Sequence, residues 1–161
     1  WSADACGNSA RTSELRAQVD AFAASSSAEH RACIGDLERI ANDAAGAVRC
    51  GDHDALIDAI GRAARALARL AAAAGAPIVP HGFDGLEALA SAERAAFCVS
   101  GAGGGDVAIF AGAAPPSAAF SSRARELGLF EIDVAMDEKG VRVVTQPPAF
   151  VAGACAATPT S

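Results

Sequence analysis

Residues 98–110 read CVSGAGGGDVAIF and place four glycines in the five-residue window from Gly101 to Gly105. Two short apolar runs flank this window, AAFCV at residues 95–99 and DVAIF at residues 106–110, and both are typical of strands. Successive glycines adopt positive φ at little cost and expose their backbone N–H groups without side-chain obstruction. A simple hairpin needs only one or two glycines. The stretch therefore predicts two strands joined by a loop that binds an anion or lets another backbone pass closely.

Two common phosphate-binding motifs do not fit this loop. A P-loop needs a lysine after its last glycine and then a helix, whereas Gly105 is followed by Asp106 and a predicted strand. A dinucleotide-binding loop needs a third glycine, where this chain has Asp106, and again a helix. The alternative that the glycines serve packing alone stays open.

Outward from the loop, the sequence predicts segregated helices and strands. Helices are expected from Thr12, from about Ser27, between the CGDHD turn and Gly75, and from a cap at Asp84. After the two strands come a helix opened by Pro115, Pro116 and Ser117 and closed by Gly128, and then the strands LFEIDVAM and VRVV. This order predicts an α+β fold with helices packed on one face of a small antiparallel sheet.

The apolar spacing also predicts which side chains are buried. The second helix is expected to bury a stripe of Ile34, Leu37, Ala41, Ala44 and Val48. In the strand LFEIDVAM, alternation places Phe130, Ile132, Val134 and Met136 inward and Glu131 and Asp133 outward. The expected core further contains Leu56, Ile60, Leu67, Leu70 and Ile109.

Length and composition limit the possible functions. The 161 residues suffice for one domain, expected over residues 1–146, followed by a poorly ordered tail over residues 147–161. A net charge of −6 argues against a nucleic-acid partner. No long uncharged apolar run predicts a membrane span, and the N-terminus does not resemble a signal peptide.

The cysteines and histidines indicate a reduced, cytoplasmic protein without a metal site. The five cysteines are odd in number and widely scattered, and no CxxC or Cys/His cluster predicts zinc.

Three arginines, Arg62, Arg65 and Arg69, share one face of the third helix. They could bind an anion, but a solvated helix face is the favoured interpretation.

Several segments together resemble the GHMP small-molecule kinases. SGAGGGD between two apolar strands resembles the third conserved motif of that family, and the flanking serine and aspartate are most like the phosphomevalonate kinase branch. AGAPIVPHGFDGLEALA at residues 74–90 is similar to the segment that leads into the motif there. WSADACGNSARTSELRAQVDAF at residues 1–22 resembles the start of a helix in that branch, with extra residues between Trp1 and Ser9 and with Arg11 where serine is usual. The resemblance runs from about Trp1 to Val144.

This resemblance implies the C-terminal half of a kinase, with the ferredoxin-like fold of that domain. The chain contains no PxxxGLGSSA-like ATP loop, and in these kinases the missing N-terminal domain carries that loop together with the catalytic aspartate and lysine. No catalytic residue and no metal ligand is therefore expected in this chain, which alone should be inactive. The chain begins at Trp1 without an initiator methionine, and we expect a fragment, a processed product or an excised domain.

The resemblance also implies which residues contact the substrate. Ser100, Gly101, Ala102, Gly103, Gly104, Gly105 and Asp106 would line the cleft and contact phosphates, and Ser9, Thr12 and Ser13 would face a small phosphorylated substrate. ATP and Mg²⁺ would be the cofactors of the complete enzyme, since phosphoryl transfer depends on positioning and charge stabilisation. Asp106 either fixes the loop through N–H groups, acts through a cation, or is simply a capping residue of the loop.

Two other functions remain open from the sequence. One is a non-catalytic binding or regulatory module that keeps the same fold. The other is a GHMP kinase for a different substrate, such as mevalonate.

Overall fold

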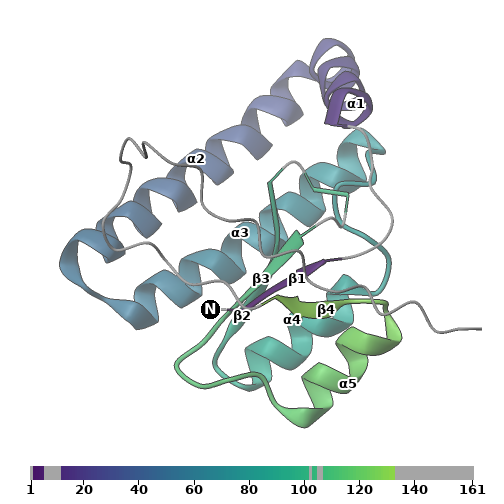
Figure 1. Ribbon diagram of the computed structural model, residues 1–161. Helices are drawn as coiled ribbons and strands as arrows, with labels where there is room; N and C mark the ends of the chain where they lie inside the picture. The colour runs from purple at the N-terminus through teal and green to yellow at the C-terminus, as the bar shows by residue number, and fades with distance from the viewer. Residues whose placement is uncertain (1, 6–11, 102, 105–106, 133–161) are drawn as a thin grey trace, which may run out of the picture.

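The computed structural model describes residues 2–5, 12–101, 103–104 and 107–132. Within these residues the chain forms five helices and four strands (Figure 1). The elements in chain order are β1 (Ser2–Ala5), α1 (Thr12–Ser25), α2 (Ser27–Cys50), α3 (His53–Ala74), α4 (Phe83–Ala92), β2 (Ala96–Ser100), β3 (Val107–Ala111), α5 (Ala118–Glu126) and β4 (Phe130–Ile132).

The strands form one antiparallel sheet in the order β2-β3-β1-β4. β2 and β3 are the two strands predicted on either side of the glycines. Ser100 pairs with Val107 at the end of the two strands that the glycine loop joins. β1 lies between β3 and β4. The sequence did not predict β1, because SADA lacks the β-branched and aromatic residues that indicate strands.

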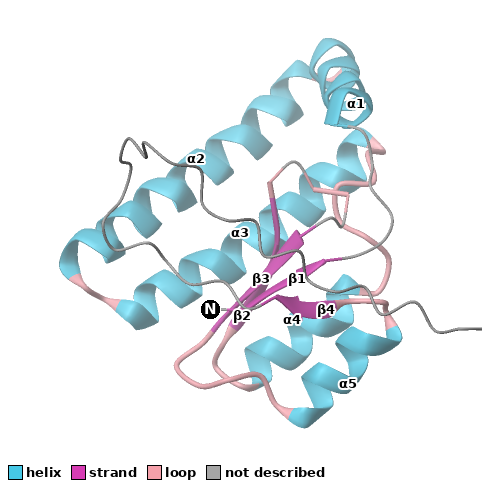
Figure 2. Ribbon diagram, viewed as in Figure 1, coloured by secondary structure: helices cyan, strands magenta, loops and turns pink. Residues whose placement is uncertain are grey.

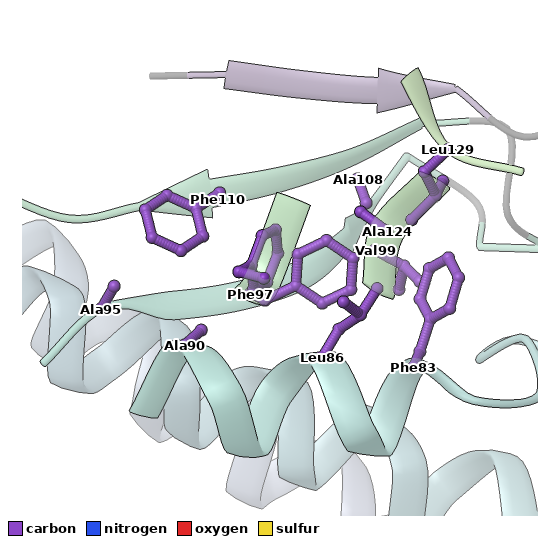
Figure 3. Packing of buried hydrophobic residues seen from close by; sticks show 11 residues of the cluster. Phe83, Leu86, Ala90, Ala95, Phe97, Val99, Ala108, Phe110, Ala124 and Leu129 are labelled. Atoms are coloured by element: carbon purple, nitrogen blue, oxygen red, sulfur yellow. The ribbon is translucent and has the colours of Figure 1, made fainter. Parts of the chain in front are cut away.

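The helices lie in two groups around this sheet (Figures 1 and 2). α4 and α5 cover one face, where Phe83 and Leu86 of α4 lie against Phe97 of the sheet (Figure 3). On the same face, Phe120 of α5 packs on Phe97 and Phe110. α3 packs against the edge strand β2, and α1 and α2 pack on α3. The predicted α+β class and antiparallel sheet are confirmed.

Local signals predicted most helix ends correctly. The Asp52 carboxylate accepts a hydrogen bond from the Ala55 N–H and caps α3, and Gly75 ends that helix with a φ of 61°. Ser117 caps α5 in the same way, through Phe120. The predicted cap at Asp84 is wrong, because α4 begins at Phe83 and Asp84 lies in its first turn.

The predicted stripe on α2 is correct at Leu37 and Ala44, which are half-buried and pack against the core between α2 and α3, and wrong at its other positions. Ile40 and Ala47 are buried, whereas Val48 is 63% exposed and Ile34 is also exposed. α2 carries small apolar residues on several sides, so spacing alone left neighbouring stripes open, and its packing against α3 selects one of them.

The predicted alternation of β4 is correct, but the predicted faces are reversed. Through β1, Glu131 is in register with Ala108 of β3, which belongs to the core beneath α4 and α5. Phe130 and Ile132 therefore lie on the opposite face of the sheet, and Phe130 is 60% exposed. Alternation defines two faces, and only the pairing register decides which of them meets the helices.

The predicted core is confirmed at Leu70, which is buried. Leu67 is half-buried and packs against the core of α4, α5 and the sheet. The other predicted positions among the described residues, Leu56, Ile60, Ile109 and Ile132, are also half-buried. Val134, Met136, the strand VRVV and the tail lie outside the described residues.

Candidate functional site

The glycine loop, residues 101–106, leaves the sheet where β2 ends. Ser100, the last residue of β2, is half-buried, and Gly101 is exposed. Gly101, Gly103 and Gly104 have φ values of 73°, 87° and 80°. This left-handed region strongly favours glycine, so the loop needs glycine at three positions for its backbone path. Ala102, Gly105 and Asp106 lie outside the described residues.

Part of the loop is packed tightly against the segment between α3 and α4. The Gly104 N–H donates a hydrogen bond to the Ile78 carbonyl oxygen at 2.8 Å. A Cβ atom on Gly103 would lie 2.6 Å from both the Ile78 oxygen and the Ile78 Cγ2. The structure thus gives Gly103 a packing role, and any anion held by this loop has to use amides other than that of Gly104.

The second predicted group of site residues lies at the start of α1. Thr12 and Ser13 are exposed in its first turn, and Ser9 lies outside the described residues. One turn further on, Leu15 is buried in a core that also contains Ile78. Figure 1 shows α1 and the glycine loop at the same end of the molecule, near the C-terminal end of α3.

The contact between Ile78 and the glycine loop was not predicted from the sequence. The stretch APIVP, residues 76–80, indicated only an extended piece between two helices. One feature of the sequence could have indicated it: Pro77 and Pro80 flank two β-branched residues, and both prolines restrict the backbone of this segment.

The three arginines of α3 are all paired with carboxylates. Arg62 contacts Asp43 at 2.9 Å and Asp58 at 2.8 Å, and these partners raise its pKa. Arg65 contacts Glu87 of α4 at 2.7 Å.

Arg69 contacts Asp36 of α2 at 2.8 Å. Hydrogen bonds from Arg39 and then Arg69 hold the pKa of Asp36 below its usual value. These pairs connect α3 with α2 and α4, and they use the positive charge that an anion site on this face would need.

An apolar cavity of about 140 Å³ lies between α3, α4 and the edge strand β2. Ala68, Val79, Phe83 and Cys98 are among the residues that line it. Burial raises the pKa of the Cys98 thiol to about 11, so this thiol stays protonated at neutral pH.

Cys98 is therefore expected to react slowly with alkylating agents. A shift from 9.0 to about 11 lowers the thiolate fraction at pH 8 about a hundredfold, and the thiolate is the reactive form. Iodoacetamide labelling followed by peptide mass spectrometry should modify the exposed Cys50 first, and Cys98 should gain reactivity as the pH rises toward 11. Equal labelling of both residues at pH 8 would contradict the buried position of Cys98.

Two further findings concern the described residues alone. Their acidic, histidine and cysteine side chains form no group of three or more that could hold a metal ion. None of their helices has both the length and the apolar character needed to cross a membrane.

Comparisons with known proteins find similarity in structure. The chain superposes on the crystal structure of a Lin0012 protein from Listeria innocua with a TM-score of 0.75 and 23% identity, over 82% of this chain and 38% of that one. It superposes on the phosphomevalonate kinase of Streptococcus pneumoniae, in complex with phosphomevalonate and AMPPNP, with a TM-score of 0.64 and 18% identity, over 83% of this chain and 39% of that one. The chain has a GHMP-like fold.

At these identities the similarity concerns the fold alone. No family model matches the sequence, and no curated protein matches it significantly. The chain spans less than two fifths of the length of either structural neighbour, so its GHMP-like fold corresponds to a part of those proteins.

Proposed function

We propose that this chain is the C-terminal, substrate- and phosphate-binding part of an ATP-dependent GHMP kinase, most like phosphomevalonate kinase. The complete enzyme would transfer a phosphoryl group from ATP to a phosphate monoester, in the cytoplasm. The observation that carries this proposal is the glycine loop, with three left-handed glycines at the open end of β2 and β3, in a fold shared with part of a phosphomevalonate kinase.

The chemistry of the loop agrees with this role. Phosphoryl transfer requires donors close to the phosphate oxygens, and backbone N–H groups of glycines provide them without steric hindrance. Gly101 suits this task best among the described loop residues, because it is exposed and a Cβ atom there would meet nothing within 4 Å. Thr12 and Ser13 would supply hydroxyl groups to the substrate from the first turn of α1.

The cofactors would be held mainly by an N-terminal domain of the complete enzyme. The phosphomevalonate kinase neighbour was solved with AMPPNP, which supports ATP as the phosphoryl donor. The described residues contain no group of three or more acidic, histidine or cysteine side chains that could hold Mg²⁺, so we assign no metal ligand to them.

The chain by itself is expected to have no kinase activity. Incubation with ATP, Mg²⁺ and phosphomevalonate should give no ADP above background in a coupled assay, whereas the product of the complete coding sequence should give ADP. Turnover by the isolated chain would disprove the proposal that ATP binding and catalysis depend on another domain of the complete enzyme. A complete product that is inactive on phosphomevalonate and mevalonate would favour the non-catalytic module.

Substitution of Gly101 tests the loop in the complete protein. A valine there would project into open space next to the proposed phosphates, and kcat/KM should fall at least about tenfold, or about 1.4 kcal/mol of transition-state stabilisation. Gly51→Val is the matched control, since Gly51 also has a positive φ of 68° and open surroundings but lies between α2 and α3. Equal activity of the two variants would place the loop outside the site.

A further inference from the structure

The segment that joins α3 to α4 supports the glycine loop through Ile78 and is tied to both helices by hydrogen bonds. Its first residues close the end of α3, where the Ala76 N–H donates to the Ala71 oxygen at 3.0 Å. The Ile78 N–H then donates to the Ala76 oxygen at 2.8 Å, which closes a three-residue turn around Pro77. At the other end, the Pro80 oxygen accepts from the Phe83 N–H at the start of α4. Both ends of the segment are thus fixed by helices.

Ile78 contacts the loop on one side and the helical core on the other. Its carbonyl oxygen holds the Gly104 N–H, and its Cγ2 faces Gly103. Its side chain is only 7% exposed and belongs to the core that Leu15 and Phe22 of α1 form with α3. One residue thereby connects the glycine loop with α1.

We infer that Ile78 is a positioning residue that holds the glycine loop and the start of α1 in a fixed relation to each other. The inference rests on the proposed function in one respect, since these are the two segments proposed to contact the phosphates and the substrate. Leu15 lies one turn beyond Thr12 and Ser13, so a shift of Ile78 that moves Leu15 also moves their hydroxyl groups. Through its carbonyl group, the same shift moves Gly104.

Two conservative substitutions separate this role from simple core packing. Ile78→Val removes one methyl group from the core but keeps Cγ2, the atom that faces Gly103. Ile78→Leu keeps the volume of the side chain but moves its branch point away from Gly103. A residue that only fills the core would tolerate leucine as well as valine.

Amide hydrogen exchange, measured by NMR on the purified chain, tests the inference without any assay of activity. Ile78→Leu is expected to lower the protection of the Gly104 amide at least about tenfold and to shift the amide signals of Thr12 and Ser13, whereas Ile78→Val should change the protection less than about twofold. Ile40→Ala is the control for general loss of stability, because Ile40 is buried in a different core between α2 and α3. Equal protection in the leucine and valine variants, or the same loss in Ile40→Ala, would overturn the inference.

Kinetics of the complete protein give a second readout. Ile78→Leu should lower kcat/KM about tenfold, while Ile78→Val should stay within about twofold of the unchanged protein. If exchange separates the two variants but the complete protein phosphorylates no substrate, the connection through Ile78 stands and the proposed function fails. If the complete protein is active and exchange does not separate them, the connection fails and the proposed function stands.

Discussion

Phe97→Ala is expected to destabilise the domain by about 3–5 kcal/mol, because it leaves a large cavity in the main core. The Phe97 ring is 1% exposed, and its centroid lies 5.2 Å from that of Phe83 and 5.4 Å from that of Phe120. The substitution removes the contacts that strand β2 makes with both α4 and α5 in the main core (Figure 3). Chemical denaturation should show the loss of free energy, and the midpoint of thermal unfolding should fall by about 10 °C.

Phe130→Ala is the matched control for this experiment. It removes the same side chain from the same sheet, but Phe130 lies on the other face and is largely exposed. Its substitution should change the stability of this chain by no more than about 0.5 kcal/mol. Similar losses in the two variants would show that both faces of the sheet are packed, contrary to the structure.

Gly103→Val should destabilise the chain by about 3–5 kcal/mol through the backbone. A side chain at a φ of 87° costs about 1–2 kcal/mol by itself. Here its Cβ would also lie 2.6 Å from the Ile78 carbonyl oxygen, so the loop has to move away and lose the hydrogen bond between Gly104 and Ile78. Urea denaturation measures the loss of free energy of unfolding. The exchange rate of the Gly104 amide shows whether its hydrogen bond to Ile78 is lost.

Gly101→Val separates the conformational cost from the steric clash. Gly101 has a similar φ of 73°, but a Cβ atom there has open space around it. We expect a loss of about 1–2 kcal/mol and unchanged protection of the Gly104 amide. If Gly103→Val were no worse than Gly101→Val, the close approach to Ile78 would be of no energetic importance, and the glycines would serve the backbone path alone.

The candidate site could be predicted from the sequence only as two separate segments. The glycine window indicated a loop of unusual backbone conformation, and the φ values of Gly101, Gly103 and Gly104 agree with that. Nothing in the spacing predicted that Gly103 meets Ile78, because the contact joins residues far apart in the chain, and local patterns carry no information about which distant segment approaches a loop. The role of the loop in phosphate binding is still a prediction.

The sequence by itself determined the features that depend on neighbouring residues. β2 and β3 follow from apolar runs on either side of the glycines. Gly75 and Ser117 mark helix ends because capping involves atoms only a few residues apart.

Only the tertiary structure decided the features that depend on partners distant in sequence. It inserted β1 between β3 and β4, and this pairing turned Phe130 away from the helices. It also selected Ile40 in place of Val48 as the buried side of α2. The physical reason is the same in each case: periodicity shows that an element has two sides, whereas the free energy of burial depends on which side another element covers.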